Sequence, residues 1–276
     1  MNFQSDQEVI ESWLYGKRPH TLKAYQYRIA EFMTFVDKPL KDITLPNLQR
    51  FQESLHGALN TQRLTINVVR SLFTFAFKEG YLDKNTAASK GFHPPKATDR
   101  LSERMLTEEE VHAIINAASK HRDRVFIRLL YLTGVRVSEL CSLQWGDVRK
   151  SKKSTQITVM GKGMKNRTIR LSQSATELIE TLRGNAKPND PVFRSQKCGH
   201  LDPSQAWRIV RAAASQAGID KDVSPHWFRH SHASHALEKG VNPALVRDTL
   251  GHSNLSITDR YVHSNPNDSS GMYLDA

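Results

Sequence analysis

The sequence predicts a mainly α-helical protein of two domains, the second of which also holds a small β-sheet or hairpin. Its 276 residues suffice for two domains, because a single domain usually takes roughly 100–200 residues. Apolar residues recur at the helical spacing of three and four along most of the chain. Two β-prone runs depart from this pattern and flank Gly161-Lys162-Gly163, which predicts a hairpin. We expect a helical domain at 1–90, a linker at 91–105, a mixed α+β domain at 106–264 and a tail at 265–276.

Four helices are expected in the first domain. The first is short and lies around Val9–Trp13, and the second covers an apolar series that begins at Leu22. The third opens at Thr44-Leu45-Pro46, since proline suits an early helical position where its missing N–H is not needed. The fourth runs from about Thr61 to a stop at Gly80. The apolar residues that define the buried faces of the last three are Leu22, Tyr25, Ile29, Phe32 and Val36, then Leu48, Phe51 and Leu55, then Leu64, Val68, Leu72 and Phe75.

The second domain begins after an aperiodic stretch that contains Pro94-Pro95 and reads as a linker. Thr107 and Glu110 form a capping-box pattern at the start of a helix. Another helix, over about 123–133, ends at Gly134. The two β-prone runs and the remaining, mostly helical stretch are Gln156–Met160, Arg167–Leu171 and 172–262.

The composition favours a polyanionic partner. Lys and Arg number 39 against 28 Asp and Glu, so the formal net charge is +11, and nucleic acid is the commonest polyanion in a cell. The alternative is a basic protein without such a partner. No apolar run approaches the roughly 18 residues of a membrane span, and the start lacks the apolar stretch of a signal peptide. Two cysteines make neither a disulfide framework nor a four-thiolate zinc site. We therefore expect a soluble, cytoplasmic protein.

Several residues form a pattern suited to a phosphate group. His226 and Arg229 are three residues apart, which places them on one face of a helix. Tyr261 comes nine residues after the histidine of Leu250-Gly251-His252. The full candidate set is Arg136, Lys162, His226, Arg229, His252 and Tyr261.

Each candidate also has a structural alternative. Arg136 can cap a helix and pair with Glu139, and Tyr261 can be a buried aromatic whose hydroxyl bonds to the backbone. Lys162 lacks the glycine spacing of a phosphate loop. A histidine cluster suggests zinc, but the glutamate of a zinc-protease helix and a third ligand are missing, so we expect no metal site. Three of these histidines are expected to pack or bond locally instead: His230, His232 and His235.

Four motifs together resemble those of the tyrosine recombinase (lambda integrase-like) family, and most of all those of the Xer-type and the phage or integron integrases. The motifs are TGVRVSEL, GKGMKNR, SPHWFRHSHASH and LGHSNLSITDRYVH. The resemblance implies an N-terminal core-binding (SAM-like) domain that clamps DNA, followed by a catalytic domain. It implies cleavage and rejoining of double-stranded DNA through a 3′-phosphotyrosyl intermediate, without metal or cofactor, and strand exchange via a Holliday junction. It also implies a homotetramer on two DNA sites, assembled from monomers or weak oligomers at the nucleoid, and in some members an accessory protein or a paired second recombinase.

The resemblance also implies a role for each candidate residue. Arg136 and Arg229 would grip the nonbridging oxygens of the phosphate, because a guanidinium binds two oxygens at once. Two histidines, His226 and His252, would add hydrogen bonds. Tyr261 would be the nucleophile, and Lys162 the general acid that protonates the leaving 5′-oxygen. Glu139 would support the site from the position of an acidic residue in the family.

Two other functions are compatible with the same residue types. A type IB topoisomerase uses a similar site but relaxes supercoils as a monomer, and a non-catalytic module would only bind DNA.

In the first domain, Arg63, Asn67 and Arg70 lie on one face of the fourth helix, and their side chains suit base edges in the major groove. The alternative is an ordinary solvated face.

Overall fold

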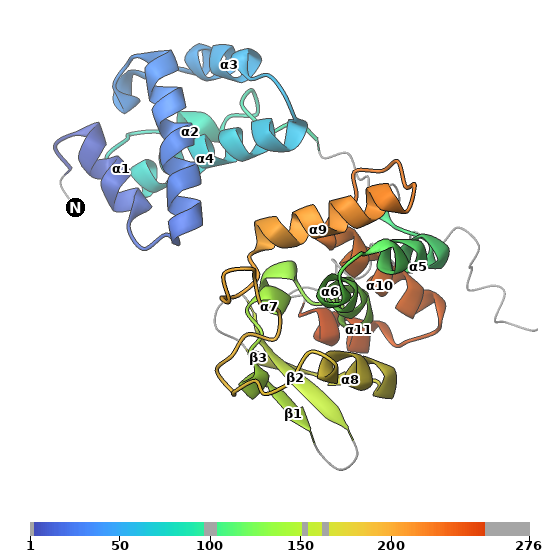
Figure 1. The fold of residues 1–276 in the computed structure, drawn as a ribbon. Helices are drawn as coiled ribbons and strands as arrows, with labels where there is room; N and C mark the ends of the chain where they lie inside the picture. The colour runs from blue at the N-terminus through green and yellow to red at the C-terminus, as the bar shows by residue number, and fades with distance from the viewer. Residues whose placement is uncertain (1–2, 97–103, 151–153, 162–165, 252–276) are drawn as a thin grey trace, which may run out of the picture. The chain divides into compact units, whose positions relative to one another are not determined.

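The computed structural model describes residues 3–96, 104–150, 154–161 and 166–251 (Figure 1). The chain divides into two compact units, Met1–Asp99 and Arg100–Ala276. The expectation of a mainly helical protein with one small sheet is confirmed. Within the described part, no helix is long and apolar enough to cross a membrane.

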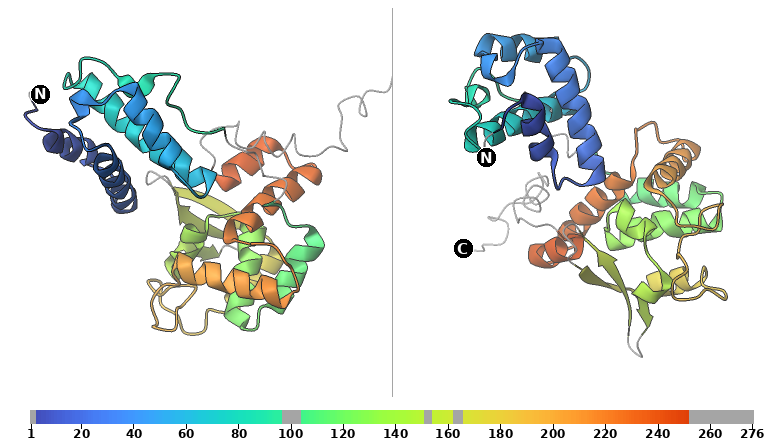
Figure 2. Two further views of the ribbon diagram at one scale, coloured as in Figure 1. Left: turned by 90° about the horizontal axis from the view of Figure 1, so that it is seen from above. Right: turned by 90° about the vertical axis from the view of Figure 1, so that its left-hand side faces the viewer.

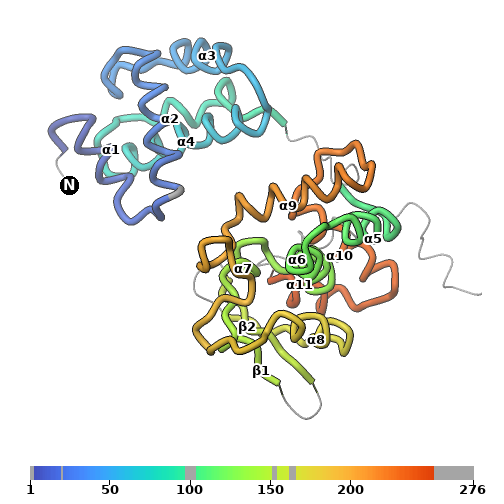
Figure 3. The backbone as a smooth tube through the Cα atoms, in the orientation of Figure 1, coloured from blue at the N-terminus to red at the C-terminus, as the bar shows by residue number. Residues whose placement is uncertain are grey.

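The first unit is built from the four helices that the sequence predicts. They are α1 (Asp6–Leu14), α2 (Pro19–Val36), α3 (Leu45–Ser54) and α4 (Leu59–Lys78), with short 3₁₀ turns at Leu40–Asp42 and Thr86–Ala88. Helix α2 packs across α4, and α1 contacts both (Figures 1 and 3). Phe32 forms edge-to-face contacts with Phe51 and Phe73, with ring centroids 4.9 and 6.1 Å apart. All three rings are fully buried and centre the core of this unit.

The buried face of α4 differs from the expected one at one position. Val68 and Leu72 are fully buried and Phe75 is partly buried, as predicted, but Leu64 is 40% exposed. The helix is covered by α1, α2 and the 3₁₀ turn Thr86–Ala88, so its apolar stripe is broad. That stripe is centred on the side of Ile66, Val69 and Phe73 and leaves Leu64 outside it. The buried stripe of α4 is wide because several elements cover the helix, whereas a spacing of three and four residues predicts a single narrow face.

The beginning of the expected linker belongs to the first unit. Phe92, which the sequence places in the linker, is fully buried in the core of the helical unit. Its described residues 91–96 contain no helix, and the Phe92 side chain anchors them to the core.

The second unit contains a group of helices and a three-stranded antiparallel sheet. Strand β2 (Thr155–Met160) pairs on one side with β1 (Val148–Lys150) and on the other with β3 (Asn166–Leu171). The β2–β3 pair confirms the predicted strands, with Ile157 opposite Ile169. Strand β1 was not expected, since three residues give too little alternation to be seen. The helices are α5 (Glu108–Ala117), α6 (His121–Thr133), α7 (Val137–Cys141), α8 (Gln173–Glu180), α9 (Pro203–Gln216), α10 (Pro225–Glu238) and α11 (Pro243–Leu250).

The helices of the second unit position the segments that matter below. Helix α10 packs along α6 and also contacts α5, α9 and α11, so it lies at the centre of the helical part. The sheet lies at one end of the unit, with α9 towards the other (Figures 1 and 2). Thr107 and Glu110 form the predicted capping box at the start of α5, with bonds of 3.0 and 3.2 Å. The loop between α6 and α7 lies against α10 and the end of α11, because the Gly134 carbonyl accepts a bond from Arg229 and Leu250 lies beside Gly134.

Candidate active site

The turn after α6 brings three helices together. Gly134 ends α6 in the left-handed conformation, with φ of 60°. A Cβ atom at this position would lie 2.6 Å from His232 Cδ2 and 2.6 Å from Leu250 Cδ2. The position therefore requires glycine for its backbone angle and for the space around it. Helices α6, α10 and α11 meet at this point.

Arg136 stands at the N-terminal cap of α7, two residues after this turn. Its backbone N–H donates to Glu139 Oε2 at 2.7 Å, and its Nη1 donates to Glu139 Oε1 at 2.9 Å. Its Nη2 donates to the Gly251 carbonyl at 3.2 Å. The cap pairing that the structural alternative predicts is thus present. The bonds to Glu139 and Gly251 together use two of the five guanidinium N–H donors, and the side chain is 33% exposed, so donors remain for an anion.

Glu139 is the buried carboxylate beneath this arginine. Its side chain is 4% exposed, and it also accepts two bonds from Arg167, from Nη1 at 2.9 Å and from Nη2 at 2.7 Å. Burial alone would raise the pKa of Glu139, but the hydrogen bonds and charges of Arg167 and Arg136 outweigh it and hold the pKa below its ordinary value. Glu139 is therefore ionised at neutral pH and fixes both guanidinium groups.

Arg167 is a residue of this cluster that the sequence analysis did not assign. It lies on β3, on the same face as the buried Ile169 and Leu171. A charged residue at an inward-facing position of an alternating strand needs a buried partner. That position, and the place of Arg167 at the end of the GKGMKNR motif, were the signals in the sequence that pointed to it.

Arg229 and His226 come from the first turns of α10. Arg229 is buried, with Nη1 donating to the Gly134 carbonyl at 2.6 Å and Nη2 to the Leu250 carbonyl at 2.7 Å. His226 is exposed, yet the protein atoms around it displace part of its hydration, and this lowers its pKa. The positive charges of Arg229 and Arg136 lower the pKa of His226 further. The three side chains thus form one electrostatic cluster, in which the imidazole is neutral at pH 7.

Three arginines from three elements converge on the last turn of α11. Arg167 Nε donates to the Thr249 carbonyl at 2.8 Å, and the next two carbonyls accept from Arg229 and Arg136, as described above. The last carbonyls of a helix lack partners within the helix and lie at the negative end of its dipole. Cationic donors therefore stabilise this end. His252 is the next residue in the sequence.

Part of the predicted set of site residues lies within the described residues, and part lies outside them. Arg136, Glu139, His226 and Arg229 lie together. Three further candidates, Lys162, His252 and Tyr261, lie outside the described residues, as does the tail at 265–276.

Three other histidines of α10 were predicted to pack or bond locally, and bonds of this kind are present at His232 and His235. His232 Nδ1 lies 2.7 Å from the Tyr131 carbonyl, and His235 Nδ1 lies 2.9 Å from the Tyr131 hydroxyl. Among the residues that the structure describes, no group of three or more His, Cys, Asp or Glu side chains is arranged to hold a metal ion.

The predicted base-reading face of α4 is partly engaged with the protein itself. Arg63 Nη1 donates to the Pro95 carbonyl at 2.6 Å, and Arg70 donates to the Phe92 carbonyl. Asn67 lies between them and is exposed. The two arginines thus hold the segment that contains Phe92 and Pro95 against α4, and base reading by these residues stays a prediction.

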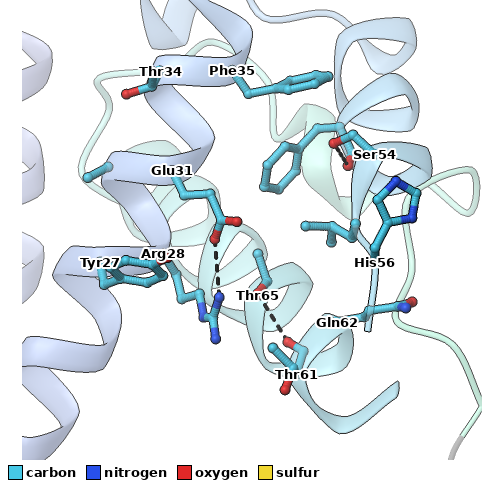
Figure 4. Close-up of a pocket in the computed structure, with 13 residues that line it drawn as sticks. Tyr27, Arg28, Glu31, Thr34, Phe35, Ser54, His56, Thr61, Gln62 and Thr65 are labelled. Carbon is cyan, nitrogen blue, oxygen red and sulfur yellow. Dashed lines mark hydrogen bonds and ion pairs between the residues drawn. The ribbon is translucent and has the colours of Figure 1, made fainter. Parts of the chain in front are cut away.

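A separate hollow occurs in the first unit. It measures about 640 Å³ and lies between α2 and the junction of α3 with α4 (Figure 4). Phe35, Phe51 and Leu55 line it together with an ion pair, Arg28 Nη1 to Glu31 Oε2 at 3.2 Å. None of the candidate residues lines it.

Comparison with known proteins gives consistent results for both units. The model of the phage integrase family matches residues 104–268, and that of the phage integrase N-terminal SAM-like domain matches residues 15–80. A tyrosine recombinase of Pseudothermotoga lettingae is 35% identical over 254 residues, covering 88% of this chain and 87% of the relative. Tyrosine recombinase XerA of Pyrococcus horikoshii is 34% identical over 253 residues, covering 90% and 85%. A lambda integrase tetramer bound to a Holliday junction shares the fold, with a TM-score of 0.76 at 20% identity over 92% of this chain and 76% of that one.

Proposed function

We propose a mechanism by which this chain breaks and rejoins DNA, given that it belongs to the phage integrase family of tyrosine recombinases. It is a site-specific tyrosine recombinase, an enzyme that cuts DNA and joins the ends again. Enzymes of this family act without a metal ion. The charges that stabilise the reacting phosphate must therefore come from side chains.

Arg136, Arg229 and His226 form the proposed cradle for the scissile phosphate. The phosphate gains negative charge as a nucleophile adds, and donors held in place beforehand stabilise that charge without reorganising during the reaction. Arg136 is held by Glu139 and Arg229 by two backbone carbonyls. The observation that carries this proposal is the convergence of Arg136 and Arg229 on the end of α11, at Leu250 and Gly251 of the LGH motif, with His226 close enough for both charges to lower its pKa.

The neutral state of His226 suits this role. Two arginines already supply positive charge, and they lower the pKa of His226. A neutral imidazole has one donor nitrogen and one acceptor nitrogen. It can therefore donate a hydrogen bond to a phosphate oxygen and also accept a proton, which arginine cannot do.

Tyr261 and Lys162 complete the proposed reaction. The Tyr261 hydroxyl oxygen bonds to phosphorus as its proton passes to the acceptor nitrogen of the neutral His226, and the bond from phosphorus to the 5′-oxygen breaks. Lys162 gives a proton to that oxygen, so a free 5′-hydroxyl and a 3′-phosphotyrosine ester result. The ester retains the energy of the broken bond. A 5′-hydroxyl from the partner duplex can therefore reverse the step and join the strands without ATP.

The proposed assembly is a homotetramer that holds two duplexes. Lambda integrase forms a tetramer on a Holliday junction in the related structure. The net charge of +11 favours binding to such a polyanion. The substrate is double-stranded DNA, so the proposed place of action is the nucleoid.

A nicked suicide duplex tests this function. The chain first selects its site from a pool of randomised DNA, and the selected duplex is then made with a nick beside the cleavage point, so that a short fragment diffuses away after cleavage. The wild-type chain should be trapped as a covalent DNA adduct. Tyr261→Phe should bind the duplex but form no adduct, whereas the matched change Tyr273→Phe should form it normally. An adduct with Tyr261→Phe, or none with the wild type on the DNA it selects, would overturn the proposal.

A further inference from the structure

Arg167 makes more contacts to the candidate site than a surface arginine would. Both terminal nitrogens donate to the Glu139 carboxylate, and Nε donates to the Thr249 carbonyl. Its side chain is 14% exposed, less than half the exposure of Arg136. Arg167 therefore faces the protein, and Arg136 faces the space where an anion can bind.

The Glu139 carboxylate is shared evenly between the two arginines. Oε1 accepts from Arg136 Nη1 and from Arg167 Nη1, both at 2.9 Å. Oε2 accepts from the Arg136 backbone N–H and from Arg167 Nη2, both at 2.7 Å. Helices α6 and α9 and strand β2 also pack on α7, but within the described residues no other charged group pairs with Glu139.

Removal of Arg167 would take away two of the four hydrogen bonds to this carboxylate, one from each oxygen. A buried anion with empty acceptor positions is strongly unfavourable, so a neighbouring donor is drawn to it. Arg136 is that neighbour, and it still has N–H groups to offer. A guanidinium that turned its fork onto Glu139 would present fewer donors to a phosphate.

Arg167 also contacts the backbone turn that Arg136 uses. Gly251 has φ of 66°, and a Cβ atom there would lie 3.1 Å from Arg167 Nη1. The guanidinium thus packs closely against Gly251, whose carbonyl accepts the bond from Arg136. A displacement of Arg167 would therefore move a second partner of Arg136.

We propose that Arg167 is a positioning residue for DNA cleavage. It makes two of the four hydrogen bonds to the Glu139 carboxylate and fixes the last turn of α11. It thereby keeps the outer N–H donors of Arg136 directed at the scissile phosphate. This inference rests on the proposed function of Arg136. It assigns Arg167 no contact with DNA.

The test compares three variants of the full chain on the nicked duplex described above. Arg167→Gln removes the charge, and Arg167→Lys keeps it but cannot bond both carboxylate oxygens in one plane. Arg183→Gln is the matched control, because Arg183 also makes two bonds to one carboxylate in the same unit, that of Glu180, at 2.8 and 3.1 Å. The measurements are the single-turnover rate of adduct formation at saturating protein, between about pH 6 and 8, and the Kd for the intact duplex.

Arg167→Gln should slow adduct formation about 100-fold, the effect expected of a misplaced group, while the Kd stays within about twofold. The deficit should grow as the pH falls. The bonds and charge of Arg167 lower the pKa of Glu139, so their loss raises that pKa and leaves only Arg136 to oppose the effect of burial. A Glu139 that becomes protonated no longer anchors Arg136. Arg167→Lys should also be slow, but its rate relative to the wild type should change little with pH. Arg183→Gln should match the wild type throughout.

Several results would overturn the inference. A wild-type rate for Arg167→Gln, a deficit that is the same at every pH, or a loss confined to DNA affinity would each contradict the positioning role. If Arg167→Gln does not fold, Arg167→Lys decides, because a wild-type rate in that variant is equally contradictory. Absence of an adduct with the wild-type chain would instead refute the proposed function, so the two failures are distinguishable.

Discussion

Gly134 offers a quantitative test of how the candidate site is packed. Gly134→Ala introduces a methyl group that would lie 2.6 Å from atoms of His232 and Leu250, much closer than an ordinary contact of 3.4–4 Å. Both neighbours belong to packed helices and cannot withdraw freely. Gly240→Ala is the matched control, because Gly240 also has a positive φ, of 76°, but nothing lies within 4 Å of its added Cβ.

The two substitutions share one cost and differ in the other. A left-handed backbone costs alanine about 1–2 kcal/mol, and this cost applies at both positions. Overpacking adds about 1–3 kcal/mol, and this cost applies at Gly134 alone. We therefore expect Gly240→Ala to lower the free energy of unfolding of the second unit by about 1–2 kcal/mol, and Gly134→Ala by about 2–5 kcal/mol.

Urea denaturation followed by tryptophan fluorescence measures this difference. Trp145, Trp207 and Trp227 all belong to the second unit. Gly134→Ala should also slow DNA cleavage about 100-fold, because the Gly134 and Leu250 carbonyls are the acceptors that hold Arg229. Equal destabilisation by the two substitutions would refute the reasoning, since the close approach of α6, α10 and α11 would then carry no energetic cost.

Three further predictions concern catalysis, acid stability and DNA recognition. Lys162→Ala should cleave slowly but regain most of its rate on a duplex with sulfur at the bridging 5′ position, since a thiol leaves without a general acid. Arg229→Ala should not regain its rate on that duplex, and equal rescue of both variants would contradict the assignment of Lys162 as the general acid. Burial lowers the pKa of His232, so the unfolded chain binds a proton that the folded chain does not, and stability should fall as the pH drops below about 6.5. His232→Asn should reduce that fall in urea titrations at successive pH values, and an unchanged slope would contradict it. Asn67→Ala should relax base preference at one position in selection from randomised DNA, and unchanged selectivity would show that Asn67 reads no base.

Much of the architecture could be predicted from local sequence signals. The four helices of the first unit follow from apolar spacing, and the α6–α7 turn follows from Gly134. The resemblance of the motifs to the tyrosine recombinase family is confirmed. Leu64 was misplaced because α4 is covered on several sides, which a single-helix pattern cannot indicate.

The internal order of the candidate site could not be predicted in the same way. Arg136 and the Gly251 carbonyl are 115 residues apart in the sequence, and Arg229 and Gly134 are 95 apart. Contacts of this kind depend on how α10 and α11 pack, and no local pattern encodes them. Arg167 was missed for the same reason, because its partner Glu139 lies on another element.

Tyr261 becomes covalently joined to DNA in the proposed mechanism, and peptide mapping of the adduct tests this step most directly. Trypsin cleaves after Arg260 and releases residues 261–276, which contain both Tyr261 and Tyr273. After nuclease digestion, fragmentation of this peptide locates the residual nucleotide on one of the two. We predict that it is attached through a 3′-phosphate to Tyr261. Attachment to Tyr273, or to a residue outside this peptide, would contradict the proposed mechanism.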